Sequence, residues 1–284
     1  RLIMRAISRL CLPGFAFLFA CGCVHAQLPS PDAPPTSSVA AAAPTQDPSA
    51  AKARAILDAM IQALGGQRWL NQQNRYLEGR IAAFYQGKPT GATVRYWQWD
   101  TPTAERIDLT EGKKDKHNWT QVFENGHCWE ITYRGKNPIP ADTCAASNRS
   151  RDHSIEVAVR VWMKDPSTIL MYEGQSLAGA HLADQVTLLN AENDSITIRV
   201  DDGTHLPLSR SWTWRDPVYQ DKNEDSEEYA DYHVIDGLPT PFTITRTHNG
   251  DDTQQRFIFK AAYNVALPPN GFDADAIAAR WDRK

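Results

Sequence analysis

The sequence predicts a mainly β protein of the α+β class, built on a strongly curved antiparallel sheet or unclosed β-barrel of about 11–12 strands. Most of the chain after residue 75 alternates apolar and polar residues with a period of two, which is typical of half-buried strands. Short turns such as Asp201-Asp202-Gly203 and Asn249-Gly250 join these segments, and connections this short require antiparallel pairing. Only two segments have helical spacing, and we expect them to cover the sheet as a lid.

The expected strands follow one another closely along the chain, with turn-forming residues between them. They are residues 76–85, 92–99, 105–109, 118–123, 128–133, 168–173, 184–189, 195–200, 206–214, 228–234, 242–248 and 255–263.

The first expected helix begins at Ala51, and Gly65-Gly66 ends it as a pair of C-capping glycines. The apolar positions with helical spacing are Ala55, Ile56, Ala59, Met60, Ala63 and Leu64. The second helix is expected in mid-chain and ends before Asp165-Pro166, since the residue before a proline disfavours the helical conformation. Its apolar face comprises Ile155, Val159, Trp162 and Met163.

The N-terminal segment has the pattern of a secretory signal. Three arginines precede a short apolar run, and small residues follow it, which predicts a signal peptide over residues 1–26 cleaved between Ala26 and Gln27. The alternative is cleavage before Cys21, because residues 18–21 resemble a lipobox whose cysteine would be acylated. Residues 27–50 are rich in Pro, Ala and Ser and predict a disordered tether, which leaves one domain over residues 51–284.

Charge and cysteine content fit an exported protein. The chain has a net charge of −4, and residues 1–26 hold three of its 30 basic residues, so the remainder is more acidic. An acidic surface argues against nucleic acid as a partner, since that function needs a basic stripe. Only Cys128 and Cys144 remain after the signal, and a pair in an oxidising compartment most simply forms a disulfide. Two unpaired thiols are the alternative.

Motifs for catalysis, metals and cofactors are absent from the sequence. It has no HExxH, CxxC, P-loop or GxGxxG pattern. Residues 174–178 approximate a nucleophile elbow, but they lie in a β context rather than between a strand and a helix. Asp221, Asn223 and Asp225 begin a calcium-loop pattern that then fails at Ser226 and Tyr232. We therefore expect no catalytic residues, no metal and no cofactor.

Apolar sheet surface is the abundant feature of the sequence. A strongly curved sheet with few covering helices can enclose a cavity for an apolar ligand, while an ordinary core under the two helices is the simpler interpretation. The ligand-cavity candidates, each alternating with mainly polar neighbours, are Val186, Leu188, Ile196, Ile198, Leu206, Leu208, Trp212, Trp214, Phe242, Ile244, Phe257 and Phe259.

Several turn motifs resemble those of the LolA/LolB-like superfamily of lipoprotein-sorting proteins. Residues 200–208 resemble its "D-x-x-T-x-L-P" turn, and residues 229–242 resemble its "Y-x-D-Y … G-x-x-x-P" segment. Residues 247–250 and 264–272 look like the next turn and the closing stretch, so that the resemblance covers about 51–272. It implies an unclosed barrel lidded by helices that carries acyl chains in a hydrophobic cavity. The lid-holding arginine and exposed leucine loop of that superfamily have no matching residue here.

These observations lead to three hypotheses. The first is a non-enzymatic periplasmic or cell-envelope protein that binds an apolar or lipid-like ligand, contacting a membrane only if Cys21 is lipidated. The second is a structural or interaction module with an envelope protein partner, which a well-packed interior would favour. A hydrolase is third, since it needs a nucleophile and base that the sequence does not display.

Overall fold

The computed structural model describes residues 47–110 and 119–281. The expected signal peptide, its cleavage at Ala26 and Gln27, the lipidation alternative at Cys21 and most of the expected tether lie outside the described residues. Among the helices of the described part, none is long and apolar enough to span a membrane.

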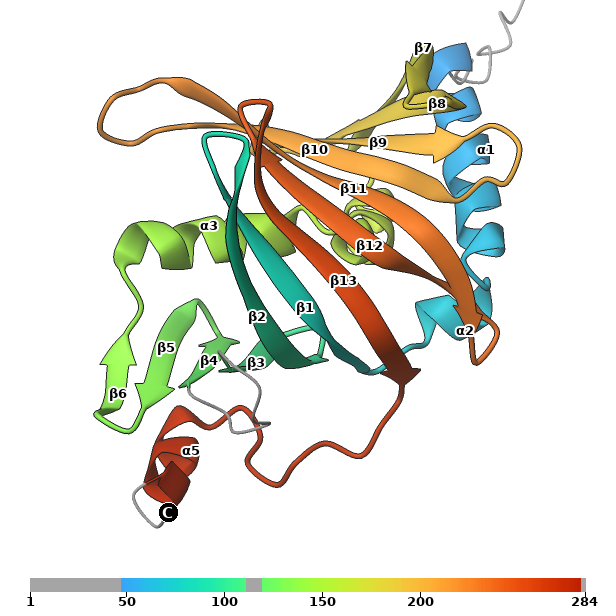
Figure 1. Ribbon diagram of the computed structural model, residues 1–284. Coiled ribbons are helices and arrows are strands. Elements are labelled where there is room, and N and C mark those ends of the chain that lie inside the picture. The colour runs from blue at the N-terminus through green and yellow to red at the C-terminus, as the bar shows by residue number, and fades with distance from the viewer. Residues whose placement is uncertain (1–46, 111–118, 282–284) are drawn as a thin grey trace, which may run out of the picture. The chain divides into compact units, whose positions relative to one another are not determined.

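The described residues form a 13-stranded sheet in which every neighbouring pair is antiparallel. Its order is β6-β5-β4-β3-β2-β1-β13-β12-β11-β10-β9-β8-β7, so β6 and β7 are free edges and the sheet does not close (Figure 1). The strands are β1 Arg75–Tyr85, β2 Lys88–Asp100, β3 Ala104–Thr110, β4 Trp119–Glu124, β5 His127–Thr132, β6 Gly135–Pro138, β7 Ile169–Ala178, β8 His181–Leu189, β9 Ser195–Asp201, β10 Pro207–Arg215, β11 Lys222–Ile235, β12 Leu238–His248 and β13 Asp251–Tyr263. The expected curved, unclosed antiparallel sheet is confirmed.

Two strand predictions need correction. The short edge strand β6 was not expected, because Gly135–Pro138 lacks the β-branched and aromatic residues that mark strands. Strand β7 continues through Gly174 to Ala178 and pairs with β8, so the elbow-like segment is part of a hairpin. It is not the strand-to-helix turn that a nucleophile elbow requires.

The helices are more numerous than the two expected. They are α1 Pro48–Ala63, α2 Gln67–Leu70, α3 Ala141–Asp152, α4 Ile155–Arg160 and α5 Ala274–Trp281, with a 3-10 turn η1 at Trp162–Lys164. Helix α1 begins at Pro48 rather than Ala51, because the Asp47 side chain caps it by accepting a hydrogen bond from the Ser49 amide at 2.9 Å. Helix α3 buries no residue, so it lacks the apolar stripe that reveals a helix in a sequence.

One half of the inner face of the sheet is covered by apolar helix faces. Leu57 and Met60 of α1 and Val159 of α4 are almost completely buried against β7, β8 and β9. We call this group the helix-covered cluster. Its buried members are Ala53, Leu57, Met60, Ile61, Leu64, Trp69, Ile155, Ala158, Val159, Trp162, Met163, Leu170, Val186, Leu188, Ile196, Ile198, Val200 and Leu238.

The other half of the inner face forms a second cluster made almost entirely of strand residues. We call it the sheet cluster, and its buried members are Leu77, Ile81, Tyr96, Ile107, Leu109, Phe123, Cys128, Ile139, Ile258 and Ala261. Cys144 is the one helical residue among its described members. On the opposite, outer face, Ile277 of α5 packs against Val122 and Ile131 of β4 and β5.

Candidate functional site

Four of the ligand-cavity candidates belong to an ordinary core. Val186, Leu188, Ile196 and Ile198 have no exposed surface and lie in the helix-covered cluster, beneath α1 and α4. Leu206 packs against the same cluster, and Leu208 lies at a register shift between β9 and β10. The helix side chains occupy the space in front of these strands, so this half of the inner face offers no room to a ligand.

The two tryptophans of β10 have aromatic and charged neighbours. Trp212 is buried and stacks on the imidazole of His153, the C-capping residue of α3, with ring centroids 5.4 Å apart. The indole of Trp214 donates to Asp225 Oδ2 at 2.7 Å and lies 3.7 Å beneath the Arg149 guanidinium. These contacts place both rings between the sheet and α3.

The last four candidates divide between the two faces of the sheet. Phe242 and Ile244 pack against the sheet cluster. Phe257 and Phe259 are 40% and 56% exposed. Arg256, just before Phe257, and Ile258, between the two phenylalanines, are buried. Because successive residues of a strand point to opposite faces, the two phenylalanines lie on the outer face. They therefore do not line the interior with the other candidates.

The disulfide prediction is confirmed. Cys128 of β5 and Cys144 of α3 are bonded, with their Cα atoms 5.6 Å apart. The bond attaches α3 to the edge region of the sheet. The residues that begin the calcium-loop pattern lie at the β10–β11 hairpin, where Asp225 accepts hydrogen bonds from Trp214 and interacts with His248 at 2.7 Å.

Charged side chains of the inner face were missed by the sequence reasoning. Arg75 of β1, Arg210 of β10, Arg246 of β12 and Arg256 of β13 all belong to the inner face, and we call these four residues the arginine belt. The registers establish this placement: Arg246 is opposite Glu227, and Arg256 is opposite both Ile244 and Ile81.

Glu227 connects three members of this interior. Arg210 donates to Glu227 Oε2 from Nε at 3.0 Å and from Nη2 at 2.8 Å, and Tyr229 donates to the same oxygen at 3.0 Å. Arg246 donates from Nε to the other carboxylate oxygen. Burial works against ionisation of Glu227, but the surrounding guanidinium groups dominate and hold its pKa far below the usual range. Glu227 is therefore a buried, fully ionised carboxylate.

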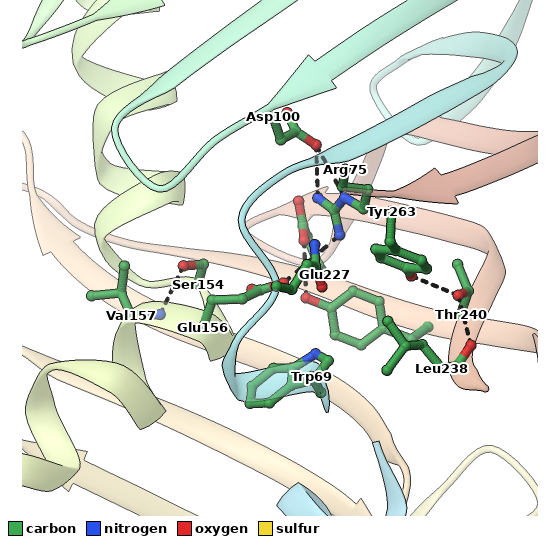
Figure 2. A network of polar contacts seen from close by, with 12 residues as sticks. Trp69, Arg75, Asp100, Ser154, Glu156, Val157, Glu227, Leu238, Thr240 and Tyr263 are labelled. Atoms are coloured by element: carbon green, nitrogen blue, oxygen red, sulfur yellow. Dashed lines mark hydrogen bonds and ion pairs between the residues drawn. The ribbon is translucent and has the colours of Figure 1, made fainter. Parts of the chain in front are cut away.

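Arg75 links the sheet to α4. It donates to Asp100 Oδ2 from Nε at 3.1 Å and from Nη2 at 2.9 Å, and its Nη1 is 3.8 Å from Glu156 of α4 (Figure 2). The hydroxyl of Ser154 caps α4 by accepting a hydrogen bond from the Val157 amide at 3.2 Å. This cap fixes the first turn of α4, which contains Glu156. The belt thus fixes the position of a helix as well as joining strands.

Arg256 is the least compensated member of the belt. It is 8% exposed, and it donates to Gln98 Oε1 at 2.8 Å and to Gln254 Oε1 at 3.0 Å. Among the described residues, no carboxylate forms an ion pair with it. Burial, followed by the nearby charge of Arg246, lowers the pKa of Arg256. A buried guanidinium whose partners are neutral amides is costly to fold and therefore of functional interest.

Tyr96 lies next to this arginine. It is completely buried, the Arg256 guanidinium is 5.6 Å from its ring centroid, and its hydroxyl has no hydrogen-bond partner among the described residues. Gly79 makes room for the ring, since a Cβ there would lie 2.9 Å from Tyr96 Cε1 and 2.1 Å from the Phe257 carbonyl oxygen. Burial raises the pKa of Tyr96, so its hydroxyl remains a protonated donor.

A weak signal for these residues is present in the sequence. Ile244, Arg246 and His248 alternate with threonines, so an arginine occupies a position where the period-two pattern expects an apolar residue. Arg256 comes two residues before Ile258 and shares its face. The pattern therefore places each of these two arginines on the same face as its neighbours two residues away, but which face is inward and which residues become partners are decided by the fold.

Comparisons with known proteins identify the fold. No protein-family model and no curated protein sequence matches the chain. Among solved structures, an outer membrane lipoprotein-sorting protein domain from Vibrio parahaemolyticus is similar, with 9% identity, 80% of this chain and 99% of that chain covered, and a TM-score of 0.50. A DUF1329 family protein from Desulfovibrio piger has 12% identity, 79% and 98% coverage and a TM-score of 0.49. A LolA superfamily protein from Nitrosomonas europaea has 11% identity, 76% and 94% coverage and a TM-score of 0.46.

The chain therefore has a LolA/LolB-like fold, as the turn motifs of the sequence predicted. Identities this low establish the fold and leave the activity to be argued from the residues of the interior.

Proposed function

We propose that this chain is a non-enzymatic protein of the cell envelope that binds an apolar or lipid-like ligand on the inner face of its curved sheet. The observation that carries this proposal is the unequal covering of that face. Apolar helix faces fill the space in front of β7, β8 and β9, whereas among the described helices the sheet cluster is met only by α3, which contributes Cys144 and otherwise polar side chains such as Arg151. Helix α3, the helix nearest to it in sequence, buries no residue.

The ligand would occupy the place that α1 and α4 occupy in the other half. Ile81, Ile107 and Ile258 form the apolar wall there and are only 7%, 3% and 4% exposed, so a ligand would enter beside the partly buried Val94 by moving neighbouring side chains apart. Burying an acyl chain against such a surface contributes about 0.8 kcal/mol for each methylene removed from water. A chain of moderate length would then bind without needing a catalytic or metal group.

A fluorescent lipophilic probe, N-phenyl-1-naphthylamine, tests this proposal. We expect saturable binding to the purified protein that a fatty acid displaces. Substituting Val94→Glu places a charge beside the sheet cluster and should weaken probe binding about tenfold or more, since an unpaired charge is excluded from an apolar contact. Thr93→Glu, which adds the same charge on the exposed outer face of β2, should leave binding unchanged. Absence of saturable binding by the unsubstituted protein would contradict the proposal.

An interaction module is a second candidate, which the outer face favours. Phe257 and Phe259 are exposed on neighbouring positions of β13, and exposed aromatic side chains are enriched at protein interfaces. An envelope protein partner would cover them. Co-purification of such a partner by the unsubstituted protein, and its loss in a Phe257→Ser, Phe259→Ser double variant, would support this function.

We also propose that the protein is exported to the periplasm or the cell envelope. The Cys128–Cys144 disulfide supports this, because disulfides persist in oxidising compartments. Intact-mass spectrometry of protein isolated from its own envelope distinguishes the two processing routes. A mature chain that starts at Gln27 indicates a diffusible binder, and an acylated chain that starts at Cys21 indicates outer-membrane anchoring.

A further inference from the structure

We propose that Arg246, Arg256 and the Tyr96 hydroxyl form an acceptor site for the anionic headgroup of the bound lipid, a carboxylate or a phosphate. The inference rests on the proposed function and deepens it, because it names the chemical class of the ligand. An acyl chain on the sheet cluster would then end at a defined polar site.

Arg256 has hydrogen-bonding capacity that the protein leaves unused. Its Nη1 donates to Gln98 and its Nε to Gln254, and no acceptor for Nη2 is present among the described residues. Its partners carry no charge, so the positive charge is buried without a paired anion. A carboxylate or phosphate would supply that anion, and charge-assisted bonds of this kind are stronger than bonds between neutral groups.

Arg246 provides the second cation of the site, and through it the site is open to solvent. Its Nε donates to Glu227, while Nη1 and Nη2 have no described acceptor. The side chain is 35% exposed, so part of the guanidinium faces solvent. Arg246 is two residues from Ile244, the residue opposite Arg256. The two arginines are therefore diagonal neighbours on one face, a spacing that long side chains can bridge.

Tyr96 is an independent observation that points to a ligand. A buried hydroxyl without a partner costs about 1–3 kcal/mol, and native proteins rarely retain one without a reason. This hydroxyl belongs to a ring against which the Arg256 guanidinium packs. It can donate to the same anion as the arginine, which would satisfy both groups at once.

Charge balance at the site also favours an anion. Arg210 and Arg246 share the single carboxylate of Glu227. Glu105 is the other carboxylate near Arg256, and it lies 3.6 Å from Arg151. Burial, reinforced by Asp100, raises the pKa of Glu105 and favours its neutral form. Apart from Arg75, which pairs with Asp100, the arginines of the belt therefore face Glu227 and Glu105, and Glu105 is shared with Arg151.

The site adjoins the apolar surface on which the ligand is proposed to lie. Ile81, opposite Arg256 on β1, and Ile258, two residues beyond it on β13, are both members of the sheet cluster. Tyr96 belongs to the cluster as well. An amphipathic lipid can thus place its chain on the cluster and its headgroup at the arginines.

The experiment compares cis-parinaric acid, a fluorescent fatty acid, with its methyl ester. The unsubstituted protein should bind the acid about tenfold or more tightly than the ester, because the ester lacks the charge. Arg246→Gln should remove most of this difference by weakening acid binding alone. Tyr96→Phe should weaken acid binding roughly threefold without lowering the melting temperature, since the lost hydroxyl has no protein partner. Arg80→Gln removes the same charge from the exposed outer face of β1 and should change neither affinity.

Each outcome of these experiments has a distinct meaning. Equal binding of acid and ester by the unsubstituted protein would overturn the headgroup site and leave the proposed function intact. Binding of neither ligand would overturn both. Stabilisation by inorganic phosphate alone, lost in Arg246→Gln and unaccompanied by binding of the acid, would show a site for free anions and overturn the assignment to a lipid. Competition by dodecyl phosphate but not by dodecanol would support the site and extend it to phosphate headgroups.

Discussion

At the scale of single residues, Glu227 is the carboxylate on which the charged interior depends. Its side chain is 6% exposed and accepts hydrogen bonds from Arg210, Arg246 and Tyr229. Arg210 in turn donates to the Ser150 carbonyl of α3 at 2.6 Å. Removal of the carboxylate would leave two guanidinium groups uncompensated and would loosen the attachment of α3 to β10.

Glu227→Gln should therefore lower the free energy of unfolding at pH 7 by about 3 kcal/mol, the usual cost of removing one partner from a buried ion pair. The pH dependence has a definite sign. The folded-state pKa of Glu227 is depressed, so its contribution is fully present above the unfolded value of about 4.3 and is lost as the pH falls. Urea denaturation between pH 7 and pH 3 should show a shallower loss of stability in the variant than in the unsubstituted protein.

Glu228→Gln is the matched control for this substitution. Glu228 is the next residue, is exposed and lies opposite Thr245 on the outer face. It should change the unfolding free energy by no more than about 0.5 kcal/mol. An equal pH slope in the Glu227 variant and the unsubstituted protein would show that Glu227 is not the linked group.

The sequence predicts burial at this scale better than it predicts partners. Period-two alternation correctly marks Val186, Ile196 and Ile198 as inward-facing, because successive residues of a strand point to opposite faces and the apolar ones are buried together. Alternation groups Phe257 with these residues, yet Phe257 faces outward, since the choice of face belongs to the whole sheet. The pairing of Arg210 with Glu227 joins residues on different strands, and only the register between β10 and β11 brings them together.

At the scale of elements, α3 is held by bonds rather than by an apolar face. The disulfide attaches it at Cys144, and Arg151 donates to the Thr103 carbonyl at 3.2 Å. Arg210 holds its end through Ser150. A helix with these attachments has no hydrophobic periodicity, so its sequence predicts a loop, whereas α1 and α4 were predicted from their apolar faces.

Replacing both Cys128 and Cys144 by alanine should detach α3 first. The chain-entropy model assigns about 3 kcal/mol to a bridge that closes a loop of this length. Hydrogen exchange followed by mass spectrometry should show faster exchange of the amides of α3, with little change in β8 and β9. Ala145→Ser, on an exposed position of the same helix, should leave exchange unchanged. Unaltered protection of α3 in the double variant would contradict this account.

The irregularity in β1 depends on a glycine. The register between β1 and β13 shifts between Glu78 and Gly79, where the Tyr96 ring crosses the strand. Gly79→Ala should lower the unfolding free energy by about 2–3 kcal/mol, because the added Cβ overlaps the Phe257 carbonyl. Gly203→Ala is the control, since its Cβ would meet only Asp201 Oδ1 at 3.5 Å, an ordinary contact. Equal thermal stability of the two variants would refute the steric role of Gly79.

At the scale of the whole described unit, two apolar clusters share one continuous sheet. The helix-covered cluster lies on β7 to β9, and the sheet cluster lies mainly on β1 to β5 and β13. Strands β10, β11 and β12 connect them and carry Arg210, Glu227 and Arg246. No break in the hydrogen bonding of the sheet separates the two halves, because every strand in the order from β6 to β7 is hydrogen-bonded to its neighbours. The two halves should therefore depend on each other for stability.

Paired core substitutions test this dependence. Leu57→Ala removes a buried side chain from the helix-covered cluster and Ile107→Ala removes one from the sheet cluster. Each should lower the unfolding free energy by about 3 kcal/mol, and the double variant should lose the sum within about 0.5 kcal/mol, because distant sites add. Circular dichroism and tryptophan fluorescence should report one coincident transition in all three variants. Leu177→Ala, at a side chain 73% exposed, should leave the midpoint unchanged. Separate transitions, with each substitution shifting only one, would show that the curved sheet unfolds as two units and that the charged strands between the clusters do not couple them.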